Sequence, residues 1–185
     1  METLNIDKEK AINAYQQGSE EQKKVLEKVF GVETFRPKNV MERVKTLSDA
    51  LKELGPNHIL VKEYNVINNN MTTLSMKHYS QLCVITAALN EGWYPKFIKD
   101  EKRYFPCFFL YTDNEIRNMS EEEKTSLVYR TLYNSNETGG VSLAFTNCDT
   151  TTVRIRSRLA FKTSELAEYA GKQFADLYVD YLLGE

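Results

Sequence analysis

The eight residues from Leu82 to Leu89 are mostly apolar and include no charged side chain. A helix built from this run is apolar nearly all round, which is typical of a helix buried on most of its sides. Gly92 follows as a residue that adopts positive φ easily and can end a helix, and Pro95 cannot continue one. The pattern therefore predicts a central buried helix that ends in an aromatic turn.

The chain after this turn has the pattern of a β-sheet. Aromatic and aliphatic residues dominate from Tyr104 to Tyr111, which favours a strand, and Pro106 is expected at a sheet edge, at a bulge or near the strand's start. Residues 127–133, 141–146 and 152–161 predict further strands, the last two because apolar and polar residues alternate there. Together these segments predict an antiparallel sheet of about four strands, a usual sheet size.

Helical periodicity marks the N-terminal part of the chain. Helices are predicted at residues 7–16 and 19–30, the second with Ser19 and Gln22 as a capping box and with Val25 and Val29 among its buried residues. A third helix is predicted from a seam of apolar residues, which are Val40, Val44, Leu47, Leu51 and Leu54. This seam covers only about two heptads, so packing within the chain is favoured over a coiled coil with a second copy.

The remaining segments complete an α+β fold with a helical N-terminal half and a C-terminal helix packed on the sheet. Residues 32–38 are expected to be extended, residues 59–61 to form a short strand, and residues 68–70 to form a loop. Thr163 is the expected N-cap of a final helix that runs to about Leu183. At 185 residues the chain is expected to be one domain, with a helical subregion at 1–56 and an α+β core at 71–185.

Composition and residue spacing give no sign of a membrane span, a metal site or a general affinity for nucleic acid. The formal net charge of −2 gives no general attraction to nucleic acid or anionic lipid, and no apolar run approaches the roughly 20 residues of a membrane span. The three cysteines, Cys83, Cys107 and Cys148, lie far apart, which favours a reduced setting. His58 and His78 lack partners at metal-ligand spacing. We therefore expect no catalytic residue, metal or cofactor, and no membrane partner.

A row of basic residues is the clearest polar pattern in the sequence. If residues 152–161 form a strand, Arg154, Arg156 and Arg158 lie on one face, with Lys162 next along it. Such a row could hold a nucleotide, the nucleic acid backbone or an acidic protein surface. The alternative is a solvated sheet face whose arginines pair with acidic residues such as those at 121–123.

Aromatic residues are unusually dense between Trp93 and Tyr111. Four of them are candidates for a protein interface or a base-stacking surface: Trp93, Tyr94, Tyr104 and Phe105. The alternative is that these rings belong to the core, since each buries a large apolar area.

Three segments of the chain contain motifs that carry a resemblance to a known family. The motifs are ALNEGW at 88–93, YFPCF at 104–108, and SRLAFK followed by ELAEYAGKQF at 157–174. With weaker similarity around residues 14–31, the chain resembles a family of small proteins of Bacteroidales phages and prophages, including crAss-like phages. It departs from the family pattern at Cys107, where a tryptophan is expected, and at Arg156, where a glycine is expected.

The resemblance implies a phage-encoded product that works in the virion or in the cytoplasm of the infected bacterial host. Our first hypothesis is a structural or accessory virion protein, of capsid decoration or head-fibre attachment type, with other phage structural proteins or a second copy of itself as partner. The second hypothesis is an intracellular host-takeover or counter-defence protein that binds a nucleotide or nucleic acid through the arginine face. The residues themselves define no reaction.

Overall fold

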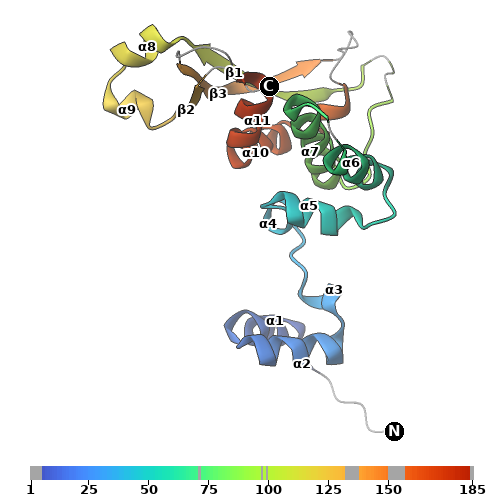
Figure 1. Cartoon of the computed structure of the whole chain (residues 1–185). Coiled ribbons are helices and arrows are strands. Elements are labelled where there is room, and N and C mark those ends of the chain that lie inside the picture. Colours follow the sequence, from blue (N-terminus) through green and yellow to red (C-terminus); the bar gives the residue numbers. More distant parts are fainter. Residues whose placement is uncertain are drawn as a thin grey trace, which may run out of the picture. The chain divides into compact units, whose positions relative to one another are not determined.

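The computed structural model describes residues 6–70, 72–96, 98, 100–131, 138–149 and 157–183. The chain divides into two compact units, Met1–Arg43 and Val44–Glu185 (Figure 1). The regular elements in the described part of the first unit are all helices, and the unit ends earlier than the helical subregion expected at 1–56. The second unit contains the sheet and the central helix.

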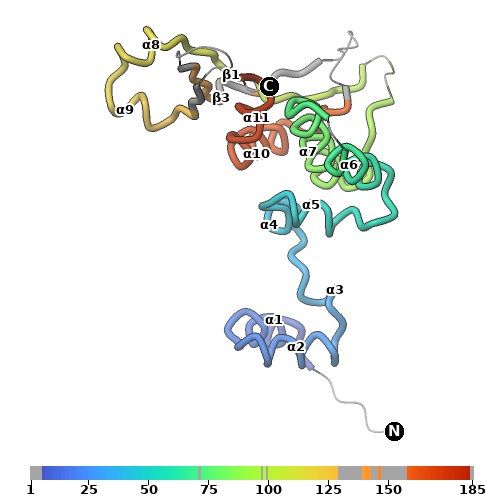
Figure 2. Tube along the Cα trace, viewed as in Figure 1, coloured from blue at the N-terminus to red at the C-terminus, as the bar shows by residue number. Residues whose placement is uncertain are grey.

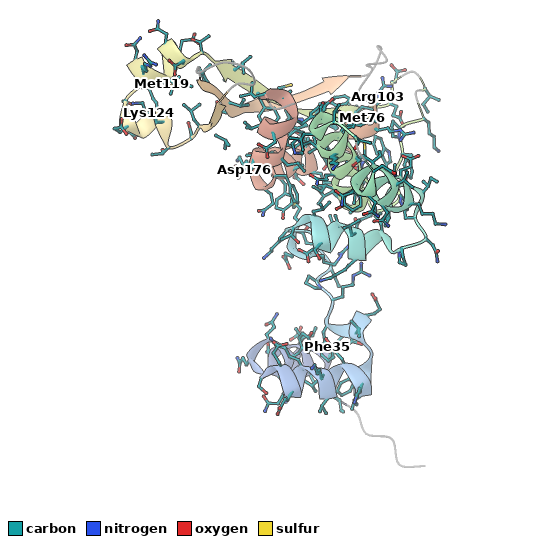
Figure 3. The ribbon with its side chains drawn as sticks, in the orientation of Figure 1. Phe35, Met76, Arg103, Met119, Lys124 and Asp176 are labelled. Atoms are coloured by element: carbon teal, nitrogen blue, oxygen red, sulfur yellow. The ribbon has the colours of Figure 1, made fainter. Side chains whose placement is uncertain are left out.

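Four helices form the first unit: α1 (Lys8–Gln17), α2 (Glu20–Phe30), α3 (Val32–Phe35) and α4 (Val40–Arg43). The predicted capping box of Ser19 and Gln22 is confirmed. Phe35 stacks on Tyr15 with ring centroids 4.4 Å apart, and Figure 3 shows Phe35 at its place in this unit. The prediction that residues 32–38 are extended is wrong over α3. The prediction that Val25 and Val29 are buried is also wrong, since both are exposed.

The second unit begins with three helices, α5 (Leu47–Leu54), α6 (Ile59–Asn69) and α7 (Leu74–Leu89). Every residue from 82 to 89 is buried, so the predicted central helix is confirmed within α7. Helices α5 and α6 both pack on α7, and their paths can be followed in Figure 2. The apolar run is therefore covered from several sides, as its composition requires.

Three predictions in this region are wrong. The expected single helix over residues 40–54 is broken after Arg43, because Thr46 adopts an extended conformation and caps α5 in a capping box with Asp49. The expected strand at 59–61 and loop at 68–70 lie within α6 or at its end. Burial of Leu60 and Val61, within a helix that packs on α7, outweighs the β propensity of the segment.

The described residues contain three paired strands, β1 (Arg103–Tyr111), β2 (Val128–Thr131) and β3 (Thr138–Asp149). They form an antiparallel sheet of order β1-β3-β2, in which β1 and β3 make the long ladder and β2 adds a short one. Pro106 lies in the edge strand β1, directly before a register shift at Cys107/Phe108, as expected. The mixed α and β character is confirmed, but the prediction of about four strands is too high for the described residues.

The predicted strand at 152–161 is wrong over its described part. Residues Ser157–Leu159 form a short 3-10 helix, η1, and only Phe161 makes a β-bridge, to Tyr104. Residues 152–156 lie outside the described residues. The alternation of apolar and polar side chains thus does not continue as a strand to Arg158.

Short helices follow β1, and two longer ones end the chain. They are α8 (Asp113–Asn118), α9 (Glu121–Lys124), α10 (Ser164–Gln173) and α11 (Ala175–Leu183). Thr163 caps α10 as predicted, but Phe174 interrupts the expected single helix. Helix α10 packs on β1 and β3, and both helices lie against one side of the sheet in Figure 1. Among the described residues, no helix combines the length and apolar character that a membrane crossing requires.

The side chain of Asn90, the residue that ends α7, connects segments that are far apart in sequence. Its Nδ2 donates to the carbonyl oxygen of Ala160 at 2.8 Å, and its Oδ1 accepts from the backbone N–H of Lys162 at 3.0 Å. Between these two residues, Phe161 exchanges two backbone hydrogen bonds with Tyr104. The three motif segments identified in the sequence therefore meet at this point, which we call the Asn90 bridge.

Replacement of Asn90 by alanine is expected to destabilise the chain by about 2–3 kcal/mol, because a buried carbonyl and a backbone N–H lose their partners. Asn90 is only 3% exposed, so water cannot readily replace the amide. The free energy of unfolding in urea provides the measurement. The matched control is Asn118→Ala, which removes an exposed bond to the Asn114 carbonyl and is expected to cost about 0.5 kcal/mol or less. Equal effects of the two substitutions would contradict the structural role of the bridge.

Candidate functional site

A pocket of about 420 Å³ lies next to the Asn90 bridge, within the second unit. Its walls come from α6, the last turns of α7, the turn that follows α7, and the segment around η1. Most lining side chains are apolar, namely Ile59, Leu60, Ala87, Trp93, Pro95 and Ala160. Because Trp93 is the chain's only tryptophan, we call this feature the Trp93 pocket.

The turn after α7 brings two aromatic residues to the pocket. Glu91 and Gly92 both have positive φ, of 50° and 84°, so the chain reverses sharply after the helix. Gly92 was expected to end the helix, but Glu91 is the first residue to enter the left-handed region. The N–H of Trp93 donates to the Asn90 carbonyl at 3.0 Å, which closes the turn. Trp93 and Tyr94 then both line the pocket.

Tyr94 is held in place by a histidine at the start of α6. His58 caps α6, with its Nδ1 accepting from the N–H of Leu60 at 3.3 Å. A neutral histidine whose Nδ1 accepts carries its proton on Nε2. Nε2 therefore donates to the Tyr94 hydroxyl oxygen, 3.1 Å away. The hydroxyl hydrogen of Tyr94 is therefore available for a further acceptor. About half of the surface of Tyr94 is exposed.

An ion pair forms the charged part of the pocket. Arg158 of η1 donates from Nη1 to a carboxylate oxygen of Glu63 in α6 at 2.9 Å. The Glu63 carboxylate raises the pKa of Arg158, so the guanidinium stays charged. The side chains are 57% and 41% exposed, so solvent screens the pair and its contribution to stability is about 0–1 kcal/mol. The rim thus offers donors and acceptors with no net charge.

Helix α7 contains buried polar groups, one of which lines the pocket. Thr86 lines the pocket and is 1% exposed, and its hydroxyl has no hydrogen-bond partner in the described part of the chain. One turn earlier, the Cys83 thiol lies close to the Tyr79 hydroxyl. Burial raises the pKa of Cys83 to about 11 and that of Tyr79 to about 12. Cys83 therefore stays a thiol at neutral pH, which does not suit a nucleophile.

The structure places the residues expected to form a site in different parts of the second unit. Arg158 lies at the Trp93 pocket together with two aromatic candidates, Trp93 and Tyr94, although the sequence placed them in separate groups. Lys162 donates to Glu91 at 3.0 Å instead of extending an arginine row. Tyr104 and Phe105 belong to β1 and are half-buried. Arg154 and Arg156 lie outside the described residues.

The structure also identifies pocket residues that the sequence did not reveal. Glu63 pairs with Arg158, whereas the acidic residues expected as partners were those at 121–123. His58 and Glu63 lie outside the strand expected at 59–61 and the loop expected at 68–70, and no helix was predicted there, so their alignment along α6 was not visible. Asn90 formed part of a recognised motif, and its polar side chain directly after an apolar run was the available signal for a buried hydrogen-bonding role.

The protein thus has a mixed α and β fold and a largely apolar pocket that two aromatic residues line. No cluster of three or more His, Cys, Asp or Glu residues that could hold a metal occurs in the described ranges. Comparisons of the chain with protein-family models, curated proteins and solved structures give no match. The geometry of the pocket and the sequence motifs therefore carry the functional argument.

The buried thiol predicts a specific pH dependence of stability. Below its ordinary pKa of 9.0, Cys83 is protonated in both the folded and the unfolded chain, so its contribution is fully present. Between pH 9 and about 11 only the unfolded thiol ionises, so stability falls as the pH rises. Urea unfolding of the chain and of Cys83→Ala at pH 8 and pH 10 provides the measurement, and the fall is expected to be smaller in the variant. An equal fall in both would contradict the shift.

Thr86→Val is expected to raise the free energy of unfolding by up to about 1 kcal/mol, because it replaces a buried hydroxyl that has no partner by a methyl group. The control is Thr125→Val, which removes an exposed hydroxyl that donates to the Glu122 carbonyl at 2.7 Å. That change is expected to be neutral or slightly destabilising. Thermal unfolding of both variants provides the comparison, and destabilisation by Thr86→Val would show that the hydroxyl has a stabilising role.

Proposed function

We propose that the chain is a phage-encoded structural or accessory protein of the virion that acts by protein–protein contact, of capsid decoration or head-fibre attachment type. One observation carries the proposal beyond the motif resemblance. Trp93, Tyr94 and Arg158 lie together at one apolar pocket, and these are the residue types that dominate binding energy at protein interfaces. The partner is another structural protein of the phage or a second copy of this chain.

The exposed surface around the pocket supports a protein partner. Ile59 and Tyr94 line the pocket, and they are 61% and 51% exposed. An interface typically has an aromatic centre that is covered on binding and a polar rim that stays wet. The pocket with its Arg158–Glu63 pair has both parts. The side chains are held by α6, by the turn after α7 and by the Asn90 bridge.

A second candidate function is an intracellular host-takeover or counter-defence protein that binds a nucleotide or nucleic acid. The observation that favours it is that Arg158 lines the same pocket as Trp93 and Tyr94, so that a guanidinium could hold a phosphate while a base stacks on a ring. Its weakness is that the two described cations of the expected basic row, Arg158 and Lys162, each pair with a glutamate. A phosphate would therefore have to compete with Glu63 and Glu91.

Mass spectrometry of purified virions tests the first function directly. We expect peptides of this chain at a copy number comparable with other minor or decorating head proteins, and their retention after washing at high salt. The control is a phage protein known to act only inside the host, which must be absent from the same preparation. Clear absence of this chain from pure virions would overturn the virion role.

Titration with oligonucleotides and nucleotides tests the second function. If Arg158 holds a phosphate, Arg158→Ala weakens binding about tenfold or more, and binding by the intact chain weakens steeply as salt rises. The control is Arg117→Ala, whose guanidinium pairs with Asp113 on α8 at 2.6 Å and does not line the pocket. Unchanged affinity in the Arg158 variant would contradict phosphate binding at this site.

A further inference from the structure

We infer that the Trp93 pocket receives a large aromatic side chain, of the size of tryptophan, from an uncharged peptide segment of the partner protein. The inference rests on the proposed function and specifies the chemistry of its partner. It depends on the volume of the pocket, the exposure of its rim and the balance of its charges.

Volume and lining define the part of the partner that enters. A cavity of about 150 Å³ accommodates benzene, and the Trp93 pocket measures about 420 Å³. It therefore has room for a two-ring aromatic group together with the backbone that carries it. The walls combine aliphatic side chains with the rings of Trp93 and Tyr94. Aromatic rings pack favourably on such surfaces in edge-on or offset arrangements.

The exposed rim favours a peptide over a free small molecule. A pocket for a small ligand usually buries most of the ligand within its own walls. Here Ile59 and Tyr94 stand more than half exposed at the pocket, so their outer surfaces would remain wet around a small ligand. A peptide that continues on both sides of its anchoring side chain would cover them. The exposed apolar rim is thus accounted for by an extended partner segment.

The charge balance of the rim indicates a neutral segment. Arg158 and Glu63 are already paired at 2.9 Å, so the pocket presents no net charge to a ligand. The remaining guanidinium N–H groups and carboxylate lone pairs can bind the carbonyl and N–H groups of a peptide backbone. The hydroxyl of Tyr94 provides one more donor, because His58 already occupies its oxygen. A phosphate or a highly acidic segment would lack a compensating free cation here.

Binding of small peptide mimics to the full chain tests the inference. The probes are N-acetyl-tryptophanamide, N-acetyl-leucinamide, adenosine and AMP, and chemical-shift changes in the protein provide the affinities. We expect the tryptophan probe to bind with a Kd of roughly 0.1–1 mM, a normal efficiency for its size. We expect binding at least about fivefold weaker for the leucine probe, because it lacks the aromatic contacts. Raising the salt from 50 to 500 mM should change the Kd less than about twofold, since no net charge is neutralised.

A matched pair of substitutions on one helix locates the binding. Ile59 and Val66 both belong to α6 and are 61% and 62% exposed, but only Ile59 lines the pocket. Ile59→Ala is expected to weaken the tryptophan probe about threefold, and Tyr94→Ala about tenfold, whereas Val66→Ala leaves the Kd unchanged. Because all three side chains are exposed, the variants are expected to fold, and thermal unfolding checks this.

Each outcome decides the inference. Weakening by Ile59→Ala and Tyr94→Ala but not by Val66→Ala supports it. Tighter binding of AMP than of the tryptophan probe, with strong salt dependence, overturns it in favour of a nucleotide site. Tighter binding of adenosine than of the tryptophan probe overturns it in favour of a nucleoside, and no aromatic binding below about 10 mM overturns it altogether. Virion mass spectrometry is independent of these probes, so a chain found in virions without aromatic binding would refute this inference alone.

Discussion

The side chain of Asn90 holds together the parts of the second unit that build the pocket. Its amide satisfies a carbonyl at Ala160 and an N–H at Lys162, about seventy residues along the chain. A buried amide can do this only when both its donor and its acceptor meet partners in the correct orientation. The bridge therefore fixes the register between the end of α7 and the segment that follows η1, and Phe161 fixes that same segment to β1.

The position of the pocket follows from this register. Because the chain reverses directly after Asn90, Trp93 and Tyr94 return along α7 toward α6. Because Ala160 is fixed by the bridge, Arg158 lies two residues away and within reach of Glu63. One buried interaction thus positions an aromatic wall and a charged rim that come from distant parts of the sequence.

Elements whose type and start depend on local sequence signals could be predicted from the sequence. The uncharged run at 82–89 required a buried helix, Pro106 required an edge strand or bulge, and the caps at Ser19 and Thr163 marked helix starts. The failures occur where packing decides. Ile59 and Val61 have high β propensity, yet they belong to a helix that packs on α7 and buries Leu60 and Val61. The break before α5 is different, because the capping box of Thr46 and Asp49 is a local signal that lay within the apolar seam and was outweighed by its periodicity in the prediction.

In the candidate site, too, the residue types could be predicted from the sequence, whereas their proximity could not. The structure also gives Arg158 a different electrostatic environment from the one expected. Trp93, Tyr94 and Arg158 could each be identified by residue type, but their proximity depends on the Asn90 bridge and on α6. Alternation had placed Arg158 in a row of like charges, where it would attract phosphate. The 3-10 turn at 157–159 instead directs it to Glu63, where its charge is compensated. A guanidinium neutralised in this way, in a pocket that two aromatic residues also line, contributes hydrogen-bond geometry and packing more than electrostatic attraction.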